Sequence, residues 1–113
     1  MRYAYKEWGE ECFKKFLGMF AISIWDEEKK EVFIIRDRIG IKPLYYANPD
    51  GRFLWASEIK VLIEHPAIKR EFNERDLPHY LSVLMQHATE TMFWGIYNVE
   101  AGNSIRIHSK GEV

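Results

Sequence analysis

Apolar residues occur at regular positions in two neighbouring segments, residues 19–25 and 31–36, and this pattern predicts a pair of β-strands. In the first segment, one face carries Phe20, Ile22 and Ile24, and the other carries Ala21, Ser23 and Trp25. The second segment is apolar on both faces as well, so we expect a hairpin that is covered on both sides. Residues 26–30 between the strands are all charged and predict a solvated turn rather than a binding site.

Residues 3–17 have the spacing of an amphipathic helix. Tyr5, Trp8, Cys12 and Phe16 follow one another at intervals of three or four residues and form a single apolar stripe. Gly9 interrupts the segment, and glycine is favoured just after the end of a helix. We therefore expect two short helices that share this stripe.

A second hairpin is predicted from residues 44–47 and 52–56, joined by a turn at residues 48–51 that contains proline and glycine. Ser57 is positioned to cap a helix that continues to about Glu64. The helix should end at His65, because a residue that precedes proline avoids the helical conformation.

The last third of the chain is less regular. Asn73 is expected to cap a further helix, in which Pro78 belongs to the first turn. The apolar positions of this helix are Leu77, Tyr80, Leu81 and Leu84. Residues 85–98 fit neither a helix nor a strand pattern, residues 103–107 predict a short strand, and residues 111–113 form a tail.

The size and charge of the chain narrow the function classes. With 113 residues and 47% hydrophobic composition, we expect one folded domain over residues 1–113. The net charge is −1 and the cations are interspersed with carboxylates, so nucleic acid is not an expected partner. We find no signal sequence and no apolar run long enough for a membrane. A single cysteine excludes an intramolecular disulfide and favours a cytoplasmic location.

Few residues suggest catalysis. Cys12 is the only thiol and is either a nucleophile, which would need exposure and a lowered pKa, or a small apolar residue of the helix stripe. The four histidines, His65, His79, His87 and His108, lie on separate predicted elements and have no metal-binding spacing. Adjacent carboxylates such as Glu10 and Glu11 do not face each other on a helix. We therefore expect no metal and no cofactor.

One dense polar segment joins the two hairpins. Its notable residues are Arg36, Asp37, Arg38, Gly40, Lys42 and Pro43. One interpretation is structural: Asp37 accepts hydrogen bonds from the loop, Gly40 adopts an unusual φ and Pro43 starts a strand. The alternative is a rigid polar loop that faces another domain or a ligand. The residues alone leave both interpretations open.

The order of these segments resembles the glutaminase domain of glutamine-hydrolysing asparagine synthetases, a class II, N-terminal-nucleophile domain. The run Arg-Asp-Arg-Ile-Gly-Ile-Lys-Pro-Leu-Tyr-Tyr at residues 36–46 carries most of the resemblance. The segments around it are similar as well, namely residues 8–12, 18–21, 25–26, 56–60, 93–96 and Gly102. The chain departs from the family at Glu100 and Ala101, where a proline-rich turn is usual.

The resemblance implies an α+β fold, a partial αββα sandwich made of the second half of the domain. In the family, a cysteine at the start of the mature chain is the nucleophile and an Asn–Gly pair forms the oxyanion hole. Neither is found here, and Cys12 matches a helix position, so no catalytic or substrate-binding residue is carried over. The expected protein is inactive alone and forms a homodimer, or it complements a separate N-terminal half.

Overall fold

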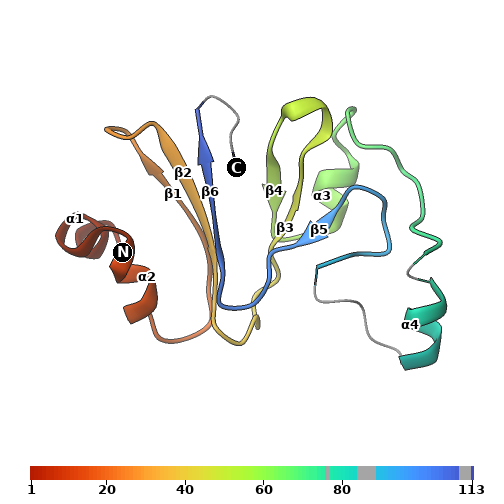
Figure 1. Cartoon of the computed structure of the whole chain (residues 1–113), viewed down its shortest axis with the longest axis horizontal. Helices are drawn as coiled ribbons and strands as arrows, with labels where there is room; N and C mark the ends of the chain where they lie inside the picture. Colours follow the sequence, from red (N-terminus) through yellow and green to blue (C-terminus); the bar gives the residue numbers. More distant parts are fainter. Residues whose placement is uncertain (76, 84–88, 110–112) are drawn as a thin grey trace.

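The computed structural model describes residues 1–75, 77–83, 89–109 and 113. Within these residues the chain forms a mixed α and β structure with two three-stranded antiparallel sheets (Figure 1). The first sheet has the order β1 (Ala21–Asp26), β2 (Glu31–Arg36), β6 (Ser104–His108). The second has the order β4 (Leu54–Ala56), β3 (Tyr45–Ala47), β5 (Tyr97–Asn98). The helices are α1 (Arg2–Trp8), α2 (Cys12–Lys15), α3 (Ile59–Ile63) and α4 (Leu77–Val83), with 3₁₀ turns at Gly9–Glu11 and Pro49–Gly51.

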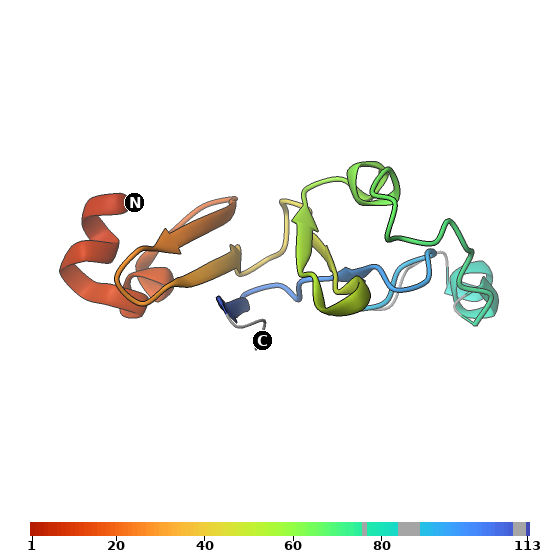
Figure 2. The same ribbon diagram turned by 90° about the horizontal axis from the view of Figure 1, so that it is seen from above.

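The elements are arranged in layers. From one end of the molecule to the other, Figure 2 shows α1 and α2, the first sheet, the second sheet, and then α3 and α4. A core that includes Ile34 and Ile107 of the first sheet and Leu44 and Val99 of the connections fills the space between the sheets. A second core, which includes Ala47 and Leu62, lies between the second sheet and α3.

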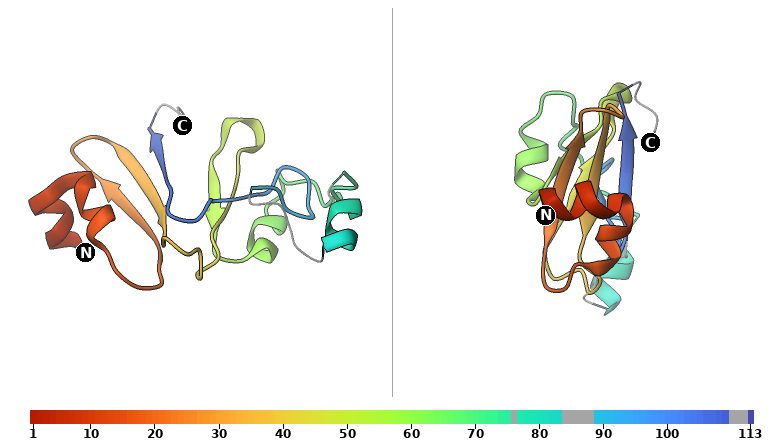
Figure 3. Two further views of the ribbon diagram at one scale, coloured as in Figure 1. Left: turned by 60° about the horizontal axis from the view of Figure 1, so that its bottom comes forward. Right: turned by 90° about the vertical axis from the view of Figure 1, so that its left-hand side faces the viewer.

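The outer face of the first sheet is covered by the N-terminal helices (Figure 3, right). The Phe33 ring of β2 lies 5.9 Å from the Tyr5 ring of α1 and 5.6 Å from the Phe13 ring of α2, between ring centroids. These contacts bury Phe33 almost completely. Aromatic packing of this kind, rather than helix propensity, holds helices as short as α1 and α2 in place.

The first predicted hairpin is confirmed, with Ile22 opposite Ile35 and Ile24 opposite Phe33. The expectation that both faces are covered holds for β2, where Ile34 and Ile35 are buried on opposite faces. It is wrong for β1, because Ser23 is exposed and Trp25 retains half of its surface. The core between the sheets reaches β1 at Ala21, and the rest of that face, at Ser23 and Trp25, stays exposed.

Gly9 divides the N-terminal helix as predicted, and its φ of 54° directs the chain into a 3₁₀ turn. The predicted stripe is wrong at Trp8, which is 49% exposed and lies beneath the Lys15 ammonium group. Because the chain changes direction at Gly9, Trp8 and the residues of α2 do not continue one helical stripe. Phe13 takes the place of Trp8 and stacks on Tyr5 at a centroid distance of 5.8 Å.

The second hairpin is confirmed by the pairing of Tyr45 with Ala56. The predicted cap at Ser57 is wrong, because Glu58 is the extended N-cap residue of α3 and no side chain caps it. The end of this helix before His65 is as predicted. Helix α3 is therefore held in place by the packing of Leu62 in the second core and not by a capping side chain.

Pro78 lies in the first turn of α4, as predicted. The predicted cap at Asn73 is wrong: Asn73 is buried, and its Nδ2 donates to Glu90 Oε2 and to the Thr91 carbonyl oxygen, each over 3.1 Å. The side chain thus fastens the segment before α4 to the segment before β5. The expected positions of Leu84, of residues 85–88 and of residues 111–112 lie outside the described residues, while β6 confirms the last predicted strand to within one residue.

Among the helices that the structure describes, none has the length and apolar character that crossing a membrane requires.

Candidate functional site

The candidate loop, residues 36–43, is one of two connections that run side by side between the sheets. It leads from β2 to β3, while residues 99–103 lead from β5 back to β6 (Figure 1, lower centre). Backbone hydrogen bonds join the two at three places: Arg36 N to Asn103 O, Gly102 N to Asp37 O, and Val99 N to Leu44 O, over 2.9–3.1 Å. We call this paired region the crossover junction.

The Asp37 carboxylate is the centre of the junction. It is almost completely buried, and four backbone N–H groups donate to it: those of Ile41 and Lys42 over 3.0 Å, Ile39 over 3.2 Å and Phe20 over 3.3 Å. Its own backbone N–H donates to Phe20 O over 2.9 Å. The side chain therefore replaces a regular turn and fixes the path of the loop around itself.

This environment changes the acidity of Asp37. The hydrogen bond from the Lys42 backbone N–H is the largest cause, and it lowers the pKa of the carboxyl group to about 2 together with those from Ile41 and other loop amides. Desolvation acts in the opposite direction and is outweighed. The group is therefore a carboxylate at every physiological pH, and its lone pairs are occupied by the loop rather than available to a ligand.

Arg36 connects the two halves of the junction through its guanidinium group. Nε donates to Lys42 O over 2.9 Å and Nη2 to Gly40 O over 2.8 Å, both within the loop. Nη1 donates to Val99 O on the other connection over 2.6 Å. One planar cation thus satisfies three carbonyl groups that no regular strand or helix would satisfy.

Position 40 needs a glycine for two reasons, its backbone conformation and the close approach of neighbouring atoms. Its φ is +72°, and a Cβ at this position would lie 2.9 Å from the Ala101 Cβ and 3.3 Å from the Arg36 Cζ. A side chain here would therefore push the two connections apart.

The remaining loop residues face outwards. Arg38 donates to the Lys14 carbonyl oxygen of α2, while Lys42 and Pro43 are exposed beside a hollow of about 340 Å³ that Met19–Ala21 and Ser57 also line. Strand β3 begins at Tyr45, so the prediction that Pro43 starts a strand is two residues too early. The hydrogen bonding expected of Asp37 and the φ expected of Gly40 are both present, and they support the structural interpretation of the loop. Whether the loop also contacts another domain stays a prediction.

Cys12 has the surroundings of a core residue. It is completely buried at the start of α2. Desolvation is the main cause that raises the pKa of the thiol above its usual value. A buried neutral thiol is a poor nucleophile, because the thiolate is the reactive form.

The three histidines that the structure describes, His65, His79 and His108, lie in different parts of the fold. His65 Nδ1 accepts a hydrogen bond from Ala67 N over 3.2 Å, and His108 Nδ1 lies 3.0 Å from Glu31 Oε1. His79 lies in α4, and His87 is outside the described residues. In the described ranges we find no group of three or more His, Cys, Asp or Glu side chains arranged to hold a metal ion.

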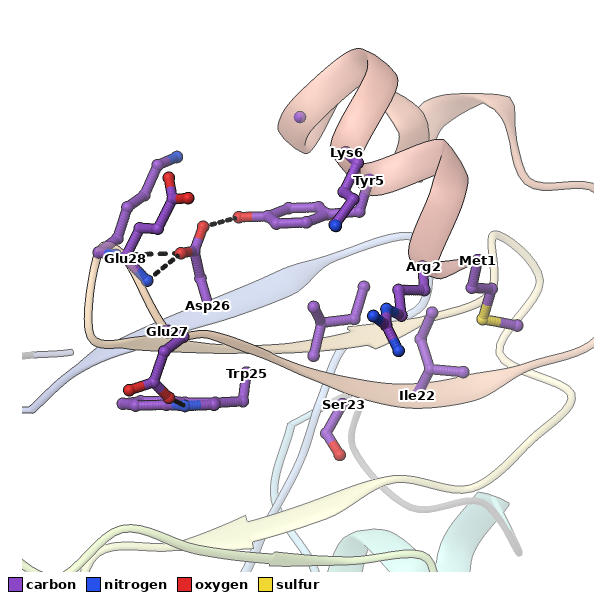
Figure 4. Close-up of a pocket in the computed structure, with 13 residues that line it drawn as sticks. Met1, Arg2, Tyr5, Lys6, Ile22, Ser23, Trp25, Asp26, Glu27 and Glu28 are labelled. Carbon is purple, nitrogen blue, oxygen red and sulfur yellow. Dashed lines mark hydrogen bonds between the residues drawn. The ribbon is translucent and has the colours of Figure 1, made fainter.

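Sequence reasoning missed a groove of about 990 Å³ between α1 and β1. Figure 4 shows Tyr5 of α1 spanning its interior to reach Asp26 at the end of β1. The Tyr5 hydroxyl donates to Asp26 Oδ2 over 2.7 Å, and burial together with this carboxylate raises the pKa of Tyr5. The prediction that Asp26 belongs to the solvated turn is wrong, because Asp26 is the last residue of β1 and is partly buried against Tyr5.

Comparison with known proteins identifies the family. The profile of a family described as "Glutamine amidotransferase domain" matches residues 1–113. This chain belongs to the glutamine amidotransferase domain family. The fold described above, with antiparallel sheets and helices on their outer faces, is consistent with that membership.

Individual members of the family are similar over most of the chain. Asparagine synthetase [glutamine-hydrolyzing] 2 of Bacillus subtilis (strain 168) is 38% identical over 109 residues, which is 92% of this chain and 15% of the relative. Asparagine synthetase [glutamine-hydrolyzing] 3 of the same organism is 32% identical over 110 residues, 96% of this chain and 18% of the relative. A putative asparagine synthetase [glutamine-hydrolyzing] of Mycobacterium bovis is 36% identical over 108 residues, 93% of this chain and 17% of the relative.

The resemblance read from the sequence is therefore confirmed at the level of the family. This chain spans less than one fifth of the length of these relatives. The relatives' full activity accordingly enters below as a proposal.

Proposed function

We propose that this chain forms part of a class II glutamine amidotransferase domain with an N-terminal-nucleophile αββα sandwich, and that its residues supply scaffold and not the nucleophile. The layer order of helices, sheet, sheet and helix supports the sandwich. The family membership and the names of the relatives support a role linked to glutamine hydrolysis. In the family that the sequence resembles, this reaction supplies ammonia for ATP-dependent asparagine synthesis.

The burial of Cys12 is the observation that supports a scaffold role without a nucleophile. Thiol-dependent hydrolysis of glutamine begins with attack of a thiolate on the side-chain amide carbon. The C–N bond then breaks, ammonia leaves, and water cleaves the thioester to give glutamate. Cys12 is the only cysteine of the chain, is completely buried and has a raised pKa, which is the opposite of what this step needs.

Release of glutamate from glutamine by the purified 113-residue chain tests the proposal. We expect the rate of the buffer blank. Turnover that is abolished in Cys12→Ser, with the fold retained by circular dichroism, would overturn the scaffold role. Turnover that survives in Cys12→Ser would come from a contaminating enzyme, because this variant has no thiol.

The proposed architecture is tested separately by NMR. Nuclear Overhauser contacts are expected between the Tyr5 and Phe33 rings on one side of the first sheet. Contacts are also expected within the cluster of Ile34, Leu44 and Val99 on the other side. Loss of the second set with the first retained would mean that the two sheets are not stacked.

A further inference from the structure

The turn between β3 and β4 contains an aspartate in an unusual backbone conformation. Asp50 has a φ of 53° and a ψ of 33°, inside the short 3₁₀ turn Pro49–Gly51. This left-handed region is disfavoured for residues that carry a Cβ, although aspartate enters it more readily than most. Gly51 follows directly with a φ of 75°. A strained aspartate is therefore joined to the residue type with the freest backbone.

The Asp50 side chain is not held by the fold. Asp50 and Gly51 are both exposed, and the Asp50 carboxyl group makes no hydrogen bond or ion pair with any residue that the structure describes. A Cβ built on Gly51 would meet nothing within 4 Å. Neither the carboxyl group nor the peptide group that follows it is therefore fixed by packing.

The other two aspartates that the structure describes are fixed in place. The buried Asp37 carboxylate accepts hydrogen bonds from four backbone N–H groups. The Asp26 carboxylate accepts one from the Tyr5 hydroxyl over 2.7 Å, and its other oxygen accepts from the N–H groups of Glu28 and Lys29 over 3.0 Å each. Any reaction of these two carboxyl groups would first have to break those hydrogen bonds.

We propose that Asp50 is a site at which the chain converts to isoaspartate without an enzyme. The Gly51 backbone nitrogen attacks Cγ of Asp50, the N–H proton and the carboxyl hydroxyl group leave together as water, and a succinimide ring forms. Water then opens the ring at one of its two carbonyl groups. Opening at Cγ restores aspartate, whereas opening at the main-chain carbonyl leaves the chain running through Cγ, which is isoaspartate.

The turn permits the motion that ring closure needs. With a ψ of 33°, the Gly51 nitrogen points away from the Asp50 side chain, so the peptide group between the two residues has to rotate. Gly51 accommodates this rotation because both signs of φ are open to glycine. The rotation is opposed by a short 3₁₀ turn, whose hydrogen-bond geometry is poor. Exposed turns of this kind open locally at little cost in free energy.

The modification would alter the second sheet. Isoaspartate lengthens the main chain by one methylene group within the turn that joins β3 to β4. These strands pair only from Tyr45 opposite Ala56 to Ala47 opposite Leu54, so the turn is close to every pair of the hairpin.

Incubation of the purified chain at neutral pH in water enriched in the heavy oxygen isotope tests the proposal, because each ring opening introduces an oxygen atom from the solvent. Digestion and mass spectrometry locate the label, and backbone fragmentation identifies isoaspartate. We expect Asp50 of the native protein to be labelled at a rate within about tenfold of the rate in denaturant. Gly51→Ala should slow the labelling at least about tenfold, because a side chain hinders both the nitrogen and the rotation.

Glu27→Gly is the matched control, since it places a glycine after Asp26 at an exposed position. In denaturant, Asp26 and Asp50 of this variant should be labelled at similar rates. In the folded variant, Asp26 should be labelled at least about tenfold more slowly than Asp50, because hydrogen bonds hold its carboxylate. The proposal is overturned if Asp50 is labelled as slowly as Asp26 in the folded variant, or if Gly51→Ala leaves the labelling of Asp50 unchanged.

Discussion

The Arg36 guanidinium donates to the carbonyl oxygen of Val99 over 2.6 Å, although the two residues are 63 positions apart in the chain. This hydrogen bond joins the connection that leaves the first sheet to the connection that returns to it. It therefore adds a side-chain link to the three backbone hydrogen bonds that join the same two connections.

Replacing Arg36 by lysine should loosen the junction. A lysine retains the charge but lacks the planar fork that reaches Gly40 O, Lys42 O and Val99 O together. We expect the free energy of unfolding to fall by roughly 1–3 kcal/mol in urea titrations, since hydrogen bonds to charged groups contribute about that much. Arg52→Lys, at an exposed position, is the control and should change stability by less than about 0.5 kcal/mol. Equal effects of the two substitutions would contradict the role of Arg36.

Replacing Gly40 by alanine should separate the two connections. The new Cβ would lie 2.9 Å from the Ala101 Cβ, in a backbone conformation that alanine disfavours. Gly51→Ala has the same sign of φ but nothing within 4 Å, so it measures the conformational cost alone. We expect Gly40→Ala to unfold at clearly lower temperature than Gly51→Ala, with the excess partly restored by adding Ala101→Gly. An excess that Ala101→Gly does not reduce would show that the contact is not its cause.

Acid should destabilise the protein through Asp37. The pKa of this carboxyl is lowered in the folded chain to about 2, whereas an unfolded aspartate has a pKa of about 3.9. The folded state therefore binds this proton less readily, so its contribution to stability is complete above about pH 4 and is lost as the pH falls towards about 2. Melting temperatures measured from pH 7 to pH 2 should fall most steeply in this window.

Asp37→Asn isolates this contribution. Asparagine cannot accept all four backbone hydrogen bonds, so at pH 7 the variant should melt roughly 5 °C or more below the wild type. The difference between the two proteins should shrink below pH 4. A constant difference down to pH 2 would mean that ionisation of Asp37 does not stabilise the junction.

The sequence pattern identified the first hairpin because the apolar residues of β2 need to be buried, and this requirement does not depend on which segments cover them. The division of the first helix at Gly9 and the turn at residues 48–51 could also be predicted from local sequence. Glycine adopts backbone conformations that other residues avoid, and proline fixes φ. The role of Asp37 followed from the same type of reasoning, because a carboxylate followed closely by glycine and backbone donors is typical of a side-chain-stabilised turn.

Features that depend on packing between distant segments were not accessible in this way. Trp8 fits the helix stripe by spacing, but the 3₁₀ turn that begins at Gly9 ends this stripe, and Trp8 is half exposed. Asn73 has the chemistry of a helix cap, yet its partners Glu90 and Thr91 lie far along the chain. The partner of Arg36 at Val99 belongs to the same class, since no local pattern connects residues so far apart.

The rate at which Cys12 reacts with a thiol reagent tests most directly whether this amidotransferase chain contains a catalytic nucleophile. Cys12 is completely buried and its pKa is raised, so labelling requires the protein to open. We predict that the native protein reacts at least about 100-fold more slowly than the same protein in denaturant. Native labelling as fast as labelling in denaturant would place Cys12 at the surface, and the interpretation of this chain as a non-catalytic scaffold would be contradicted.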